Sequence, residues 1–218
     1  EGIGAYFTED TKIIDVSGKT IYPSFIDIYS DFGIAKPKKT TSSRRSGTPQ
    51  YDAGRKGFYW NDHIRPETEA SNSFKFDSKK AAEYLKAGFG VVNTHLQDGI
   101  ISGNGVLVAL NTNSSDAYRI LDTKSAQYFS VNKSRLSGQA YPGSFMGKTA
   151  LLRQVYMDAK WYEGGNAKNK DLSLEALIAN KNLTQIFNAG QTNLNAIRLD
   201  KVGDESGVQF SFVGSGLE

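Results

Sequence analysis

The sequence predicts an α/β fold, in which strands of a parallel sheet alternate with helices. In the last third of the chain, a strand pattern at residues 183–187 is followed by a helical pattern at 193–202 and a strand pattern at 208–213. Residues 146–162 have the clearest helical periodicity, with apolar side chains at every fourth position. Repeated strand–helix–strand units are typical of a parallel sheet with helices packed against it.

The remaining elements are predicted from shorter patterns. Ser78 is expected to cap a helix that ends at Gly88, and residues 172–179 form a shorter helix. Apolar strand patterns occupy residues 13–16, 21–28 (expected to be buried), 91–94, 106–110 and 127–131. Because the chain stops soon after a predicted core strand, two architectures stay open: an open doubly wound sheet, or a barrel of which the chain holds only the first strands.

Composition excludes several classes of site. The sequence has no cysteine, so neither a thiolate zinc site nor a disulfide is available, although an exported protein can also lack cysteine. Its net charge of +3 is too small to argue for nucleic acid, and no apolar run is long enough for a membrane span. The first residues contain no signal pattern and read like the middle of something longer. Residues 35–57 are rich in Lys and Arg, with Asp52 as the sole acid, and we expect a mobile basic loop there.

Several motifs together resemble the amidohydrolase superfamily over nearly the whole chain. Residues 12–28, which lead into Tyr29-Ser30-Asp31, resemble the point at which a small β-sandwich is followed by the first barrel strand of that family. Further similarity, including similarity to the imidazolonepropionase-like branch, lies at residues 60–67, 85–89, 98–103, 141–147, 152–154 and 158–159. The resemblance implies a partial TIM-like (β/α)8 barrel of the metal-dependent hydrolase type. Residues 1–22 would end the β-sandwich, and residues 23–218 would supply the first strands of an incomplete barrel.

The resemblance also implies a catalytic site with zinc or another divalent metal, which activates water and polarises an amide carbonyl. Tyr29 and Asp31 occupy the positions of the family's His-x-His pair, and Asn188 lies on a strand that normally carries a further ligand. A phenol of pKa about 10 is a poor zinc ligand at neutral pH. A site needs about three ligands, so we expect the metal site of this chain to be degenerate.

The two histidines of the chain fall outside the matched ligand positions. His95 follows a predicted strand, at the end where barrel strands present functional residues. His63 lies beside Arg65 in a predicted loop, and Asp98 precedes Gly99 in a predicted turn. We regard His95, Asp98 and His63 as candidate substrate or barrel-mouth contacts, with structural roles as the alternative.

Three functions are compatible with these observations. The first is a non-catalytic, amidohydrolase-like domain whose partner is the rest of its own barrel or a second, intact amidohydrolase domain in the same polypeptide. The second is an active hydrolase of C–N bonds that uses Asp31, His95 and ligands from beyond this chain. The third is an open-sheet module that binds a small molecule at the C-terminal ends of its strands.

Overall fold

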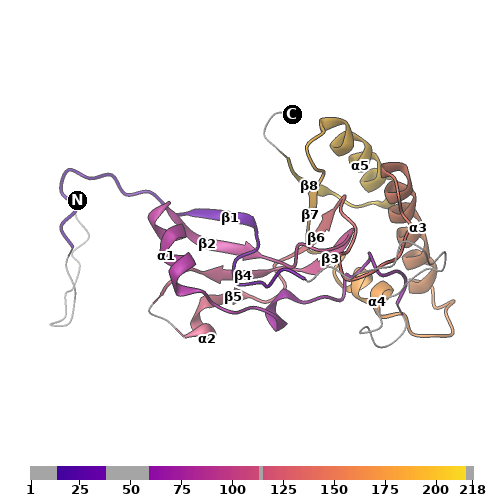
Figure 1. Cartoon of the computed structure of the whole chain (residues 1–218), viewed down its shortest axis with the longest axis horizontal. Helices are drawn as coiled ribbons and strands as arrows, with labels where there is room; N and C mark the ends of the chain where they lie inside the picture. The colour runs from indigo at the N-terminus through magenta and orange to yellow at the C-terminus, as the bar shows by residue number, and fades with distance from the viewer. Residues whose placement is uncertain (1–13, 38–58, 113–114, 215–218) are drawn as a thin grey trace, which may run out of the picture.

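The computed structural model describes residues 14–37, 59–112 and 115–214. Within these residues the chain forms two four-stranded mixed sheets and five α-helices (Figure 1). The first sheet has the order β1 (Phe25–Ser30), β2 (Phe89–Thr94), β4 (Val106–Ala109), β5 (Ile120–Asp122). The second sheet has the order β3 (Ile101–Asn104), β6 (Ala126–Ser130), β7 (Thr184–Asn188), β8 (Phe210–Val213).

The predicted (β/α)8-type barrel is wrong, because the described strands form two separate mixed sheets and no closed barrel. In the first sheet β1 and β2 are parallel, but β2, β4 and β5 pair antiparallel. In the second sheet β6, β7 and β8 are parallel, but β3 pairs antiparallel with β6. Between β2 and β6 the described chain contains one short α-helix, Asp116–Arg119, which is too short to form a crossover between parallel strands. Such crossovers need a dozen or more residues, whereas antiparallel neighbours can be joined by a short turn.

Five α-helices complete the fold: α1 (Ser78–Lys86), α2 (Asp116–Arg119), α3 (Phe145–Glu163), α4 (Leu172–Ala179) and α5 (Asn193–Ser206). The four longer ones confirm the helical patterns of the sequence. The predicted cap of α1 is shifted by one residue, because the side chain of Asp77 accepts hydrogen bonds from the backbone N–H groups of Lys79 and Lys80. Asp171 caps α4 in the same manner, through Ser173 and Leu174.

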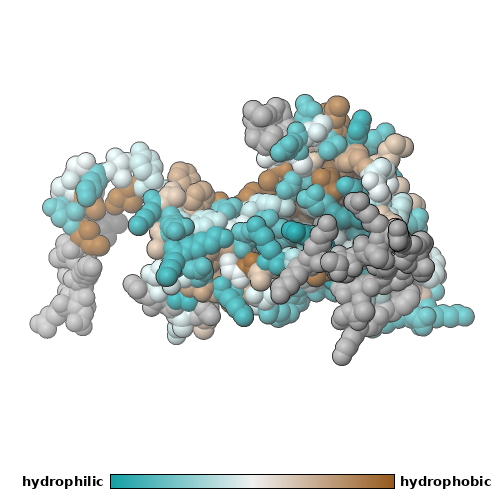
Figure 2. Space-filling view, viewed as in Figure 1, coloured by the Kyte–Doolittle hydropathy of each residue, from teal (hydrophilic) through white to brown (hydrophobic). Residues whose placement is uncertain are grey.

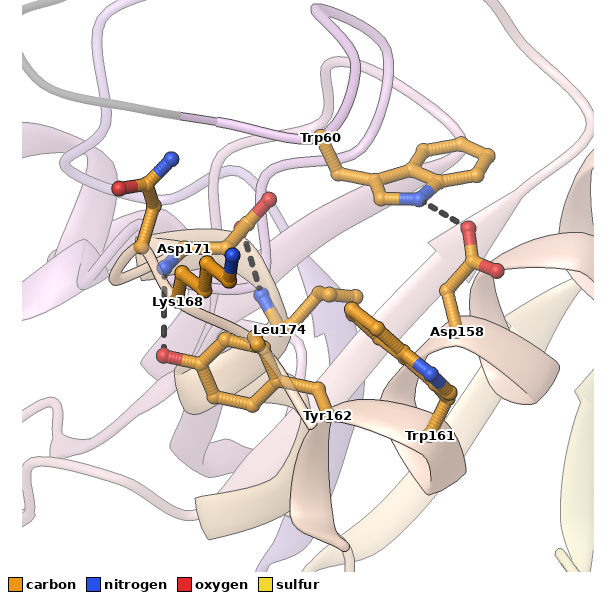
Figure 3. Close-up of a pocket in the computed structure, with 9 residues that line it drawn as sticks. Trp60, Asp158, Trp161, Tyr162, Lys168, Asp171 and Leu174 are labelled. Carbon is orange, nitrogen blue, oxygen red and sulfur yellow. Dashed lines mark hydrogen bonds between the residues drawn. The ribbon is translucent and has the colours of Figure 1, made fainter. Parts of the chain in front are cut away.

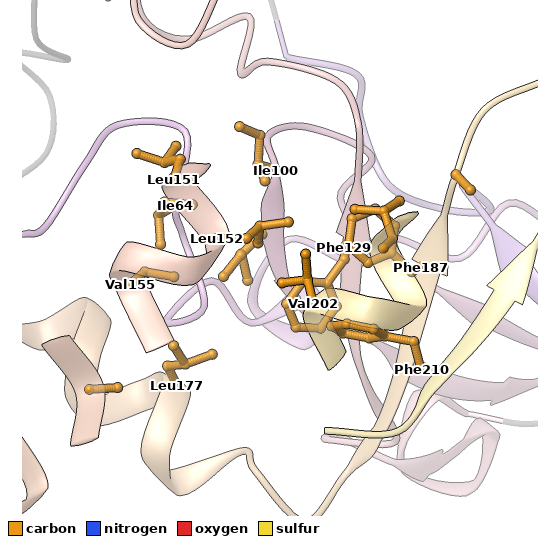
Figure 4. Close-up of a cluster of buried hydrophobic side chains, with 14 of the residues drawn as sticks. Ile64, Ile100, Phe129, Leu151, Leu152, Val155, Leu177, Phe187, Val202 and Phe210 are labelled. Atoms are coloured by element: carbon orange, nitrogen blue, oxygen red, sulfur yellow. The ribbon is translucent and has the colours of Figure 1, made fainter. Parts of the chain in front are cut away.

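The larger hydrophobic core lies between the second sheet and helices α3, α4 and α5 (Figure 4). Alternate residues of β6 point to opposite faces of the sheet, as expected for a strand. Phe129 packs into this core, with its ring 5.6 Å from that of Phe187 and 5.3 Å from that of Phe210. Tyr128 instead faces Tyr29 of β1, in a small cluster that joins the two sheets.

A second core belongs to the first sheet and α1, and is centred on Phe32, Val92 and Val108. The strand predicted at residues 21–28 begins only at Phe25, and it is not buried. β1 lies at the edge of its sheet, and Ile26 and Ile28 are 57% and 51% exposed. Figure 2 shows apolar surface along the upper edge of the molecule, above this strand.

The predicted β-sandwich remnant and basic loop fall largely outside the described residues. Of residues 1–22, the described part (14–22) contains a turn and no strand. Of the basic segment at 35–57, residues 35–37 lie in neither helix nor strand, and the rest lies outside the described ranges. Among the helices that the structure describes, none combines the length and the apolar character needed to cross a membrane.

Candidate functional site

The candidate residues from the sequence gather where parallel strands end. Tyr29 lies near the end of β1, Asp31 follows that strand, and His95 follows β2. Asn188 is the last residue of β7, which runs parallel to β6. Because the C-terminal ends of parallel strands meet at one edge of a sheet, this is where α/β proteins commonly bind ligands.

His95 is fully buried between two tyrosines. Its imidazole stacks on the ring of Tyr128, with ring centroids 3.6 Å apart and planes 3° from parallel. The Tyr29 ring is inclined at 65° to the imidazole, with ring centroids 4.6 Å apart. Neither ring nitrogen has a hydrogen-bond partner in the described part of the chain. Burial lowers the pKa of His95 to about 3, although the charge of Asp31 acts in the opposite direction. The imidazole is therefore neutral near pH 7.

Tyr29 and Asn188 hold each other through a side-chain hydrogen bond. The Oδ1 atom of Asn188 also accepts a hydrogen bond of 2.9 Å from the backbone N–H of Gly190. Burial raises the pKa of Tyr29, and the bond to Asn188 opposes that rise only in part. The Tyr128 hydroxyl donates to the carbonyl oxygen of Ile28 at 2.8 Å. Both phenols therefore keep their protons at neutral pH.

Asp31 forms ion pairs with two lysines. Its carboxylate oxygens lie 3.0 Å from Nζ of Lys36 and 3.2 Å from Nζ of Lys80. Partial burial raises the pKa of Asp31, but the hydrogen bonds and charges of Lys36 and Lys80 outweigh this and leave the pKa below its usual value. The carboxylate is ionised and already neutralised by side chains of this chain.

Asp31 and His95 nevertheless share one cavity of about 160 Å³. Lys36, Gln97 and Arg135 also line it. Its walls thus offer a carboxylate, two cations, an amide and a neutral imidazole. Such a set can exchange hydrogen bonds and charge with a small polar molecule.

His63 and Asp98 lie in the loops beside this cavity and do not line it. The Nδ1 atom of His63 accepts a hydrogen bond from the backbone N–H of Ser134 at 3.1 Å, so Nε2 carries the proton and donates to the carbonyl of Gln139 at 3.1 Å. Asp98 accepts from the Ser134 hydroxyl and from the backbone N–H of Arg135. The structure therefore gives both residues positioning roles, in a loop that carries Arg135 to the cavity.

The donor set does not fit a catalytic zinc. In the described ranges, no three His, Asp or Glu side chains come together as a metal-binding group. A zinc ion needs at least three deprotonated ligands, and neither the phenol of Tyr29 nor the amide of Asn188 provides one. Asp31 and His95 are donors of a suitable kind, but Asp31 is engaged by two lysines.

Sequence reasoning missed two residues that shape this site. Tyr128 provides the flat surface beneath His95, and the adjacent aromatic residues Tyr128 and Phe129 in one predicted strand were a signal for a buried side chain on each face. Arg135 reaches the cavity from a loop, and no local pattern in the sequence predicts that contact.

Comparison with known proteins leaves the family of the chain open. No protein-family model matches it, and no similar curated protein and no similar solved structure was found.

Proposed function

We propose that this chain is a non-catalytic, amidohydrolase-like domain that binds a small polar molecule. The observation that carries the proposal is the arrangement at the strand ends. Tyr29 and Asn188, which occupy ligand positions implied by the family resemblance, are engaged with each other and with Gly190, and the Tyr29 ring packs against His95. A hydrolytic metal centre would need those positions to converge on an ion.

The cavity beside His95 supports a binding role. A buried imidazole without a hydrogen-bond partner is costly, and such groups in native proteins commonly have a functional reason. A ligand with both an acceptor and a donor group could bond to His95 and to Asp31 or Arg135 at once. With about 160 Å³ available, that ligand has only a few non-hydrogen atoms.

Bound zinc per chain tests the non-catalytic part. The purified protein is equilibrated with zinc, the excess is removed, and the metal is counted. We expect a ratio near zero, and the same for Asp31→Ala and His95→Ala. A ratio near one or two that falls in these variants, but not in the exposed control Asp200→Ala, would contradict the proposal.

That outcome would favour a second function, an active metal-dependent hydrolase completed by residues outside this chain. One observation speaks for it: Asp31 and His95 line the same cavity, and both nitrogens of His95 lack a partner among the described residues. The reaction type would then be hydrolysis of an amide or another C–N bond. Asp31→Ala should abolish turnover in the complete protein.

A further inference from the structure

A larger pocket lies between the segment at Trp60, the end of α3 and the start of α4, and shares no lining residue with the cavity beside His95. It has a volume of about 540 Å³, which is within the range of small-molecule sites. Aromatic rings from two segments form much of its wall: Trp60, which precedes the loop of His63, and Trp161 and Tyr162 at the end of α3. Leu174 of α4 adds an apolar contact (Figure 3).

Two of the rings are fixed by hydrogen bonds. Trp60 donates through Nε1 to Oδ2 of Asp158 at 2.6 Å. The Tyr162 hydroxyl donates to Glu175 at 3.0 Å and accepts from the backbone N–H of Asp171 at 3.2 Å. A binding surface that is rigid before the ligand arrives loses less entropy on binding. Trp161, in contrast, is 55% exposed, although large apolar side chains are usually covered.

The charges around the pocket favour a cation. Asp158 accepts hydrogen bonds from Trp60 and, at 2.7 Å, from the amide of Gln154. Both donors are neutral, and within the described ranges no Lys, Arg or His forms an ion pair with Asp158. A second carboxylate, Asp171, and a single cation, Lys168, also line the pocket. Its lining is therefore negative overall.

We propose that this pocket binds a small organic ammonium ion. The faces of tryptophan and tyrosine rings attract cations, and aromatic cages are a common means of holding a quaternary ammonium group. The carboxylate of Asp158, held beside Trp60, adds a negative charge where the rings alone would give only their quadrupoles. A carboxylate or phosphate ligand would be repelled by that charge, whereas a neutral sugar could donate hydroxyl hydrogen bonds to Asp158 but would gain no attraction between opposite charges. The proposal is independent of the site near His95.

The two tryptophans of the chain make the test direct. Both Trp60 and Trp161 line this pocket, and the sequence contains no other tryptophan. Fluorescence excited selectively from tryptophan therefore reports on the pocket, and calorimetry on the same samples detects binding that leaves fluorescence unchanged. We would titrate choline, its uncharged isostere 3,3-dimethylbutan-1-ol, and glucose, each at constant ionic strength. We expect choline to bind about tenfold more tightly than the isostere, as the cation–π and charge contributions predict.

Several outcomes would overturn the proposal. Equal binding of choline and its isostere would mean a merely apolar pocket, and binding of glucose in preference to choline would mean a carbohydrate site. Binding of phosphatidylcholine vesicles without binding of free choline would mean a membrane contact. The absence of both a fluorescence change and measurable heat with choline would exclude an ammonium site.

Substitutions separate the effect of the Asp158 charge on binding from an effect on folding. Asp158→Asn removes the charge but keeps an oxygen that can accept from Trp60. We expect it to weaken choline binding about fivefold or more and to leave the isostere unaffected. The matched control is Asp200→Asn, an equally conservative change at an exposed position of α5, which should have no effect. Trp161→Phe should weaken choline binding by a smaller factor, because phenylalanine is a poorer cation–π partner. Unchanged binding in Asp158→Asn, with the same unfolding temperature as the wild type, would contradict the proposal.

Discussion

The two sheets of this molecule have the same number of strands but are protected to different degrees. The second sheet packs against three helices. In the core between them, Phe129 and Phe187 of the sheet and Val202 of α5 are fully buried. Among the described residues, α1 is the only substantial helix that covers the first sheet, and the edge strand β1 exposes Phe25, Ile26 and Ile28. The difference follows from connectivity. Parallel strands β6, β7 and β8 are joined by helical crossovers that cover the sheet, whereas the antiparallel strands β2, β4 and β5 have short connections that supply no such cover.

Matched removal of one phenylalanine from each sheet should show the largest difference. Phe129→Ala in the second sheet leaves a cavity among three helices and should lower the free energy of unfolding by about 3–5 kcal/mol. Phe25→Ala, on the exposed edge of the first sheet, should change it by about 0.5 kcal/mol or less. Chemical denaturation monitored by circular dichroism measures both. Similar losses in the two variants would show that β1 is covered in solution.

His95, at the junction of the two sheets, should make stability depend on pH. Its pKa is about 3 in the folded state and about 6.5 in an unfolded chain, so the unfolded state binds more protons between these values. Stability should therefore fall as the pH falls from 6.5 towards 3, by up to about 1.4 kcal/mol per pH unit from this residue. His95→Phe keeps a flat ring against Tyr128 and should remove this part of the slope. Urea denaturation at several pH values tests it; identical slopes in the two proteins would exclude burial of a neutral His95.

Two helix caps provide a smaller, matched comparison. Asp77 caps α1 beside the first sheet and is exposed, whereas Asp171 caps α4 beside the second sheet and is 3% exposed. Asp77→Ala should lower the free energy of unfolding by about 1 kcal/mol, the usual value for a lost cap. Asp171→Ala should cost about 2 kcal/mol, because the N–H groups it leaves are buried. Thermal or urea unfolding of both variants measures the two losses in free energy of unfolding. Equal losses would mean that water reaches the N–H groups at the start of α4.

The smallest expected effect on stability, but a visible effect on association, concerns the exposed face of β1. The double variant Ile26→Lys, Ile28→Lys should change the free energy of unfolding by about 0.5 kcal/mol or less, because both side chains are half-exposed. Charged side chains on an edge strand oppose pairing with other chains. Light scattering should therefore show less self-association than in the wild type. Greater association would mean that the two isoleucines shield apolar surface beneath them, which the lysines would leave exposed.

The sequence was a good guide wherever an element is specified by its own residues. The long helix predicted at residues 146–162 is α3, the strand predicted at 127–131 is β6, and the short helix at 172–179 is α4. Each has a local period that a single stretch of chain displays. The prediction failed at β3, because no strand was predicted at Ile101–Asn104. Four residues with two small side chains carry too little pattern to indicate a strand, and pairing with β6 stabilises it.

The candidate site divides in the same way. Tyr29, Asp31 and Asn188 were selected because they match ligand positions of the family that the sequence resembles, and His95 because it follows a predicted strand; the structure places the four near one another at the strand ends. The sequence did not predict that Asp31 binds two lysines or that His95 stacks on Tyr128. It also did not predict that Trp60 and Trp161, about 100 residues apart in the chain, line one pocket.

The sequence by itself therefore determined the four longer helices and most of the strands, because helical and strand periods are visible in neighbouring residues. Only the tertiary structure decided the direction of β3, β4 and β5, the separation into two sheets, and the partners of His95 and Asp158. The physical reason is that strand direction and side-chain contact depend on residues far apart in the chain. Their pairing is set by how the apolar faces of whole elements are buried together, and no local pattern records it.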